Sequence, residues 1–231
     1  NHLIDAGDFK SAVDAGQVAQ LAIPTNPEVL DALGRALEES GDHLQAISTF
    51  NRIAAVLPGS PGPQLRLAVV HKRAGNVAEW AASLKKAFEI APQSPEVHRQ
   101  LVAFSRVTRD PRIALAAAKE LQKTRPTKAS GYTLEGGIEA SRKNWPAALA
   151  AYRQALVKDD RPARAAVSVY MAYGAIGKPA ESERFAGEWL KGHPADVAFL
   201  GHLGSVAMAR KDFAGSERWY SELVKIDAGN V

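Results

Sequence analysis

Apolar residues between positions 27 and 60 follow the spacing of two consecutive amphipathic helices. Asn26 and Pro27 open the first helix, because an Asn side chain caps a helix start and proline fits the first turn. The apolar residues of this first helix are Val29, Leu30, Leu33 and Leu37. The second helix carries Leu44, Ala46, Ile47, Phe50, Ile53 and Ala54. Gly41 separates the two helices and Pro58 ends the second, so the pattern predicts a helix–turn–helix unit.

The same unit recurs along the whole chain with a period of 34 residues. Prolines on this period are Pro24, Pro58, Pro92, Pro126 and Pro194, and glycines on it are Gly7, Gly41, Gly75 and Gly177. We predict one array over residues 1–231, with full units at 27–60, 61–94, 95–128, 129–162, 163–196 and 197–230. Residues 1–26 form the second half of a truncated unit. Each helix pair leaves an apolar face that the next pair must cover, so neighbouring units stack.

The unit resembles the tetratricopeptide repeat, a 34-residue helix–turn–helix. The residues that match are Leu30, Leu33, Gly34, Leu37, Ala46, Phe50 and Pro58. The resemblance implies an all-α fold, a right-handed superhelical α-solenoid, in which Gly34 and Ala46 allow two helices to cross closely. Three residues depart from the pattern: Trp80 at a small-residue position, Val102 at a Gly or Ala position, and Glu135 at a Leu position, next to Leu134.

The two ends of the chain fall inside repeat units. Residues 1–26 begin in mid-unit, and residues 227–231 resemble the start of a further unit. We therefore expect the chain to be a fragment of a longer array. Any signal peptide, lipid anchor or catalytic domain would then lie outside it.

Composition and charge narrow the class of protein. The chain contains 46% apolar residues, which excludes disorder as its main state. It contains no Cys, which excludes disulfides, thiolate metal sites and Cys-based catalysis. The longest apolar stretch, 197–209, is shorter than the roughly 18 residues of a membrane span. The net charge of +4 is too mild to indicate a nucleic-acid partner, and aromatic residues do not alternate with the basic ones.

Three sequence segments resemble a narrower group of repeat proteins. They are Gly131-Tyr-Thr-Leu-Glu-Gly-Gly-Ile138, Trp145-Pro-Ala-Ala-Leu-Ala-Ala-Tyr-Arg-Gln-Ala-Leu156 and Glu188-Trp-Leu-Lys-Gly-His-Pro194. Over about residues 129–231 the chain is similar to the repeat lipoprotein associated with the exosortase (PEP-CTERM) protein-sorting systems of Gram-negative bacteria. The resemblance implies a periplasmic or membrane-anchored envelope protein, anchored through an upstream lipobox. A cytoplasmic location is the alternative.

Motifs of catalysis are missing from the sequence. There is no phosphate loop, dinucleotide fingerprint, His-Glu-x-x-His or Gly-x-Ser-x-Gly. The six histidines are not paired at helical spacing, so we predict packed or solvated side chains and no metal site. Adjacent carboxylates at Glu38–Glu39 and Asp159–Asp160 point apart on a helix, which predicts solvated surface. We predict a protein that is not an enzyme, with no catalytic residues and no cofactor. The alternative is a repeat arm of an enzyme whose catalytic domain lies elsewhere.

The first helix of each tetratricopeptide unit lines a concave groove, mainly through its second, fifth, ninth, twelfth and thirteenth residues. In the first full unit these residues are mostly acidic: Glu28, Asp31, Arg35, Glu38 and Glu39. The next two units are basic, through Lys72, Arg73, Arg99 and Arg106. The last three units are small and apolar, and Arg164 is their one charged groove residue. We select as groove residues Ser130, Thr133, Gly137, Val167, Met171, Gly174, Gly201, Ser205 and Met208.

These residues predict a scaffold that binds a protein or peptide. The small residues and methionines would seat an apolar peptide or partner helix, and the four basic side chains would hold its acidic end. The alternatives are an inner face buried by a tight superhelix or by a further unit, and a basic set that is merely solvated. The clamp for acidic C-termini is absent, because no unit pairs Lys at the fifth place with Asn at the ninth. The Asn ladder of glycosyltransferase superhelices is also absent. The oligomeric state is left open.

Overall fold

The computed structural model describes residues 2–158 and 163–227, and this part of the chain is helical without strands. The helices are α1 (His2–Asp5), α2 (Phe9–Ala22), α3 (Pro27–Glu39), α4 (His43–Val56), α5 (Pro61–Arg73), α6 (Val77–Ile90), α7 (Pro95–Thr108), α8 (Arg112–Thr124), α9 (Ser130–Ser141), α10 (Trp145–Lys158), α11 (Ala163–Ala175), α12 (Pro179–Gly192), α13 (Val197–Ala209) and α14 (Phe213–Asp227). The predicted all-α fold of tandem helical repeats is confirmed.

Side-chain caps fix where several of the helices begin, among them α3, α5 and α7. The Asn26 side chain accepts hydrogen bonds from the backbone N–H groups of Glu28 and Val29, each at 3.0 Å, and Pro27 occupies the first turn of α3. Ser60 and Ser94 cap α5 and α7 in the same way, each followed by proline. A cap removes one of the unsatisfied N–H groups at a helix start, so the register of these helices is set locally.

The turn between the two helices of each repeat contains a residue in the left-handed conformation. Gly7, Gly41, Gly75 and Gly177 have φ between 75° and 86°. The other repeats place side chains in the same conformation, and these residues are Arg109, Lys143 and Lys211 with φ of 58°, 62° and 60°. This explains why glycine follows the period in part of the chain, since glycine adopts this conformation without steric cost.

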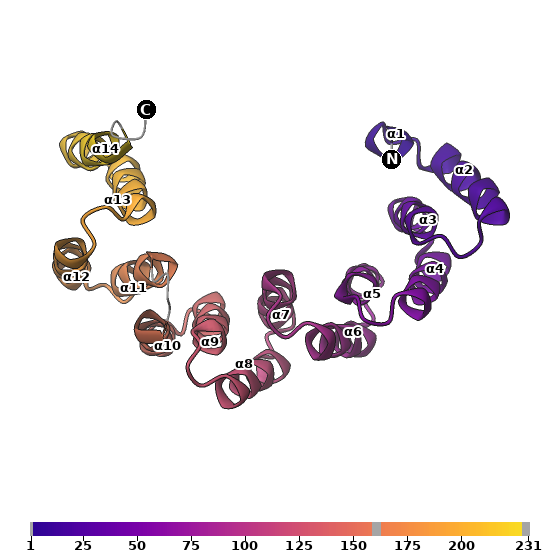
Figure 1. The fold of residues 1–231 in the computed structure, drawn as a ribbon, viewed down its shortest axis with the longest axis horizontal. Helices are drawn as coiled ribbons and strands as arrows, with labels where there is room; N and C mark the ends of the chain where they lie inside the picture. The colour runs from indigo at the N-terminus through magenta and orange to yellow at the C-terminus, as the bar shows by residue number, and fades with distance from the viewer. Residues whose placement is uncertain (1, 159–162, 228–231) are drawn as a thin grey trace. The chain divides into compact units, whose positions relative to one another are not determined.

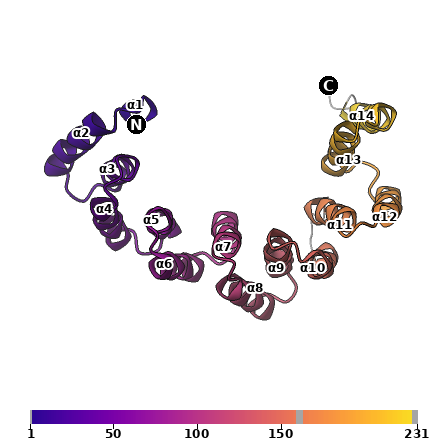
Figure 2. The same cartoon turned by 180° about the vertical axis from the view of Figure 1, so that it is seen from behind.

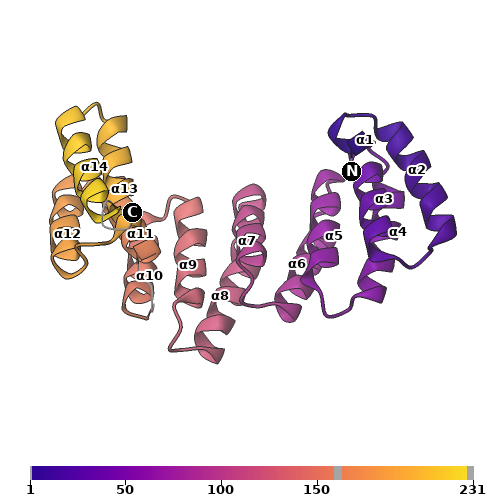
Figure 3. The ribbon, with the colours of Figure 1, turned by 45° about the horizontal axis from the view of Figure 1, so that its top comes forward.

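The chain divides into two compact units, each described here by itself: unit 1 is Asn1–Ala117 and unit 2 is Ala118–Val231. The prediction of one continuous array stays a prediction. Within unit 1, α3, α5 and α7 lie on one side and α2, α4 and α6 on the other (Figure 1), which Figure 2 shows from behind. Within unit 2, α9, α11 and α13 lie on one side and α10, α12 and α14 on the other. The two helices of a repeat lie side by side in the pairs α3–α4, α5–α6, α9–α10, α11–α12 and α13–α14 (Figure 3).

Glycines in the first helices make room for aromatic rings of the second helices. A Cβ atom at Gly34 would lie 2.7 Å from the Phe50 ring, and one at Gly204 would lie 2.9 Å from the Tyr220 ring. We expected Gly34 to serve a close crossing with Ala46, and the structure shows that Phe50 is what requires it. The core of unit 1 around this contact is Leu30, Leu33, Leu37, Ala46, Phe50, Ile53, Leu67 and Val70.

Two departures from the repeat pattern have clear structural consequences. The Trp80 side chain is 2% exposed and meets Phe104 of α7 edge-on, with ring centroids 4.7 Å apart. Trp80 therefore fills the interface between two repeats, while α5 and α6 remain closely packed. The repeat pattern has a buried Leu at position 135, where this chain has Glu. Leu134 is buried instead, and Glu135 forms an ion pair with Lys119 at 2.8 Å. Asp159 and Asp160 lie outside the described residues.

Candidate partner-binding faces

The predicted groove residues of unit 2 lie on its first helices, and we call their surface the unit 2 face. It consists of Ser130, Thr133 and Gly137 on α9, Val167, Met171 and Gly174 on α11, and Gly201, Ser205 and Met208 on α13. Met171 is 53% exposed and Met208 is 49% exposed. Thr133, Gly174 and Ser205 are also exposed. These five residues form the open part of the face.

The other four residues of the unit 2 face are half-buried or support its packing. Val167 packs against the core cluster that contains Tyr170 and Phe199. A Cβ atom at Gly201 would lie 3.5 Å from Leu223, an ordinary contact distance. The Ser130 hydroxyl is buried, and Gly137 is half-buried. These four residues are less accessible than the other five, so a ligand would reach the exposed residues first.

Aromatic packing and one polar network hold α11 against α13. The Tyr170 ring meets Phe199 edge-on with centroids 6.0 Å apart, and meets His202 in the same way at 5.8 Å. The Tyr170 hydroxyl donates to Glu183 at 2.8 Å, and Glu183 pairs with Arg210 at 3.6 Å. Burial and the Glu183 carboxylate raise the pKa of Tyr170 to about 12. The hydroxyl is a hydrogen-bond donor at physiological pH, and its bond to Glu183 ties α11 to α12.

The acidic groove residues predicted for the first full repeat, residues 27–60, do not all face solvent. The Glu38 side chain is 5% exposed and pairs with Arg73 of α5 at 3.2 Å, so the prediction of a solvated Glu38–Glu39 pair is wrong for Glu38. Glu39 pairs with the same guanidinium at 3.0 Å. The reason is the register of the repeats, which places the last turn of α3 beside the last turn of α5. Burial raises the pKa of Glu38, and Arg73 opposes that effect.

The predicted basic set of unit 1 is partly used within the chain. Arg73 is held by two carboxylates, and Arg99 pairs with Glu96 on its own helix. The ammonium group of Lys72 lies 5.7 Å from the centroid of the Trp80 ring. Arg106 is exposed. A partner's carboxylate would have to compete with Glu38, Glu39 and Glu96 for two of these cations. Their action together with the apolar residues on one ligand stays a prediction.

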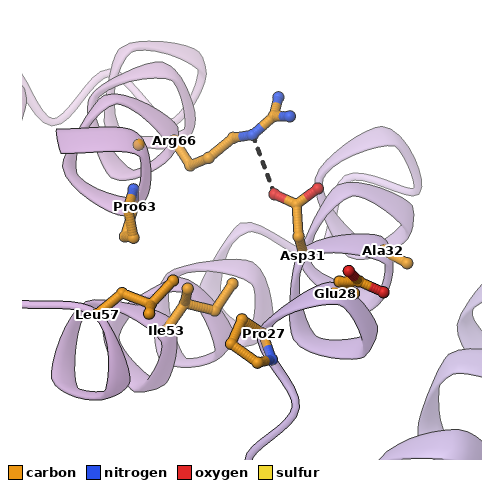
Figure 4. Close-up of a pocket in the computed structure, with 9 residues that line it drawn as sticks. Pro27, Glu28, Asp31, Ala32, Ile53, Leu57, Pro63 and Arg66 are labelled. Atoms are coloured by element: carbon orange, nitrogen blue, oxygen red, sulfur yellow. Dashed lines mark hydrogen bonds and ion pairs between the residues drawn. The ribbon is translucent and has the colours of Figure 1, made fainter. Parts of the chain in front are cut away.

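Sequence reasoning missed a cavity of about 480 Å³ in unit 1, between α3, α4 and α5. Its lining is Pro27, Glu28, Asp31, Ala32, Ile53, Leu57, Gly62, Pro63 and Arg66 (Figure 4). Three of these residues, Glu28, Asp31 and Gly62, lie at groove positions of their repeats, Gly62 as the second residue of the repeat 61–94. The apolar wall comes from the end of a second helix, which a search confined to first helices does not include. Gly62 could have indicated the cavity from the sequence, because a glycine at a groove position has no side chain to fill the space.

Four of the histidines, His43, His71, His98 and His202, are half-buried, and His2 and His193 are exposed. Burial lowers the pKa of His71, His98 and His202. One ring nitrogen of His98 lies 2.7 Å from the Pro92 carbonyl oxygen. In the part of the chain that the structure describes, no group of three His, Asp or Glu side chains is arranged to hold a metal ion. Over the same residues, no helix has the length and hydropathy needed to cross a bilayer.

Comparisons with known proteins agree with this architecture. A family model, the tetratricopeptide repeat, matches residues 107–165 and 171–231. The fold is similar to a crystal structure of a tetratricopeptide repeat protein from Parabacteroides merdae, with a TM-score of 0.52 and 12% identity over 97% of this chain and 89% of that one. It is also similar to yeast Tom70, with a TM-score of 0.53 and 11% identity over 94% of this chain and 55% of that one. A search of curated proteins finds no match.

Proposed function

Because the chain belongs to the tetratricopeptide repeat family, whose fold implies a scaffold for protein–protein interaction, we propose that its unit 2 face binds an apolar segment of a protein partner. The observation that carries the proposal is the exposure of Met171 and Met208 on two neighbouring first helices. Both lie on a surface with Arg164 as its one charged groove residue. The role is one of binding, without catalysis by this chain.

The chemistry of the unit 2 face fits a partner helix or extended apolar peptide. A methionine side chain is flexible and polarisable, so it packs against apolar surfaces of irregular shape. Gly174 is exposed, and beyond its own helix the nearest heavy atom to a Cβ there would be the Ser182 hydroxyl oxygen at 3.8 Å. The backbone of a partner can therefore approach α11 closely at this residue. An amphipathic helix laid in a groove uses apolar anchors of this kind.

We further propose that the partner belongs to the bacterial envelope. The support is the resemblance of residues 129–231 to the repeat lipoprotein of exosortase (PEP-CTERM) sorting systems. Under this proposal the chain acts in the periplasm or is anchored to a membrane through a segment outside residues 1–231. Its partners are then other proteins of the sorting or exopolysaccharide machinery.

The test is affinity capture with a matched pair of variants. The Met171→Glu/Met208→Glu double variant places two charges on the unit 2 face. The Val157→Glu/Val224→Glu variant places the same two charges on α10 and α14, at side chains that are 84% and 61% exposed. Proteins captured from envelope extract are identified by mass spectrometry, and each is then purified for a binding isotherm. We expect the methionine variant to lose its partner by more than about tenfold in Kd and the valine variant to keep it.

Two results bear on the two parts of the proposal, and one control comes before them. Equal binding by both variants would overturn the role of the unit 2 face. Capture of the same partner from a cytoplasmic extract but not from an envelope extract would overturn the envelope assignment and leave the face intact. Circular dichroism must first show equal helix content in all three proteins, so that loss of binding reports on the surface alone.

A further inference from the structure

The cavity of unit 1 combines an apolar floor with a charged rim. Ile53 is 4% exposed and Leu57 is 39% exposed, and both come from the last turn of α4 and the residue after it. Pro27 and Pro63, from the first turns of α3 and α5, complete the apolar wall (Figure 4). At about 480 Å³ the space lies within the range of small-ligand pockets. It can accept a large apolar side chain together with part of its neighbour.

The rim of the cavity carries an excess of negative charge. Asp31 and Arg66 face each other across it and form an ion pair through one guanidinium nitrogen, Nε, at 3.2 Å. Glu28 is exposed on the same turn of α3 as Asp31. Two carboxylates and one guanidinium give the lining a net charge of −1. A cation that enters the cavity therefore meets a favourable local field.

Helix starts often bind anions, but the two that border this cavity have few N–H groups left to donate. The Asn26 side chain already accepts from the N–H groups of Glu28 and Val29. The Ser60 hydroxyl accepts from the Gly62 N–H at 3.3 Å. Pro27 and Pro63 have no N–H group. An anionic ligand would find Arg66 alone, and Arg66 already pairs with Asp31.

We propose that this cavity is a second peptide-binding site, which takes a segment of a protein partner with an apolar side chain next to a lysine or arginine. The apolar side chain packs on Ile53 and Leu57. The cation lies between Glu28 and Asp31. The site goes beyond the function proposed for the unit 2 face, because it lies in unit 1 and selects for charge, so either site can fail without the other.

Three synthetic peptides test the proposal on the full chain. Each is an acetylated and amidated nonapeptide with one leucine in a Gly-Ser frame, flanked by two lysines, two glutamates or two glutamines. Binding is measured by methyl NMR of the Ile53 and Leu57 side chains. We expect the lysine peptide to shift these methyl signals and to bind about tenfold more tightly than the glutamate peptide at low salt. The glutamine peptide should fall between the two.

A matched pair of variants separates local from general charge. Glu28→Lys should weaken the lysine peptide by about fivefold. Glu79→Lys changes the same charge in the first turn of α6, outside the cavity lining, and should leave binding within about twofold. The proposal is overturned if the glutamate peptide binds as tightly as the lysine peptide, or if Glu79→Lys weakens binding as much as Glu28→Lys. It is equally overturned if no peptide shifts the Ile53 signal at millimolar concentration.

Discussion

In unit 1 ion pairs add to the aliphatic packing between the first helices of adjacent repeats, whereas in unit 2 aromatic rings make this contact. Ion pairs Asp31–Arg66 and Glu38–Arg73 connect α3 with α5. In unit 2, Tyr170 packs against Phe199 and connects α11 with α13. The helical hairpin is the same in both units. The repeat fold therefore allows the chemistry of the contact between adjacent first helices, here called the joint, to vary.

The two joints leave different surfaces for a partner. In unit 1 the inter-repeat ion pairs use much of the charge on the first helices, and the cavity beside Asp31 keeps a net negative rim. In unit 2 the contact between α11 and α13 is mainly aromatic, with the one ion pair Glu183–Arg210 beside it, and Met171 and Met208 remain exposed. If both proposals hold, one family of repeats presents a charge-selective site and an apolar site in one chain.

The largest effect should come from the residue that fills the space between repeats in unit 1. Trp80 stands where unit 2 has Ala148, Ser182 and Ser216. Truncation by Trp80→Ala removes a buried ring that packs on Phe104, and should cost about 3–5 kcal/mol of unfolding free energy. Interactions in repeat proteins reach mainly to the nearest neighbours, so the loss should be local. Hydrogen–deuterium exchange should accelerate in α5, α6 and α7.

The control for Trp80→Ala is Ser182→Ala, at the same place in a unit 2 repeat. Ser182 is buried and its hydroxyl donates to the Tyr170 carbonyl at 3.0 Å. Its loss should cost only about 1 kcal/mol and accelerate exchange in α11 and α12. If Trp80→Ala accelerated exchange equally in α13 and α14, the local character of the joint would be disproved.

The next largest effect concerns the ion pair between Glu38, which is buried, and Arg73, which is partly exposed. Arg73→Met leaves the Glu38 carboxylate without its cation in a buried place, and should cost about 2 kcal/mol at pH 7. Burial already raises the folded-state pKa of Glu38, and loss of Arg73 raises it further. A carboxyl group whose folded-state pKa lies above its unfolded-state pKa favours the folded state while it is protonated. This contribution is fully present below the unfolded-state pKa and is lost as the pH rises through the folded-state pKa. The variant should therefore approach the parent near about pH 4.

Urea unfolding at several pH values measures this difference. Arg106→Met removes an exposed cation of the same type and should change the unfolding free energy by less than about 0.5 kcal/mol at every pH. A penalty for Arg73→Met that is the same at pH 4 and pH 7 would show that packing of the arginine stem, rather than the charge of Glu38, is responsible.

The parts of this structure that depend on local chemistry were predictable from the sequence. Caps such as Asn26 and the proline after it set the helix starts, and these act within a few residues. The burial of Glu38 was not predictable in this way, because it depends on a guanidinium 35 residues away. The cavity was missed for a similar reason, since three helices contribute to it. The left-handed turn residues without glycine were also missed, since lysine and arginine give no local signal for this conformation.

The smallest effect should come from the left-handed turn residues between the two helices of a repeat, whose residue types also differ between the two units. In unit 1 three of the four left-handed residues are glycine, whereas in unit 2 two of the three are lysine. The φ of 62° at Lys143 brings its Cβ close to the following carbonyl, a strain that glycine lacks. Glycine also gains entropy in the unfolded chain, which offsets part of the relief. Lys143→Gly should therefore raise the unfolding free energy by about 0.5–1 kcal/mol. Lys143→Ala keeps the strained backbone and removes the charge, so it should give no gain in the same urea experiment. Equal stabilisation by both variants would assign the effect to the lysine charge and not to the turn.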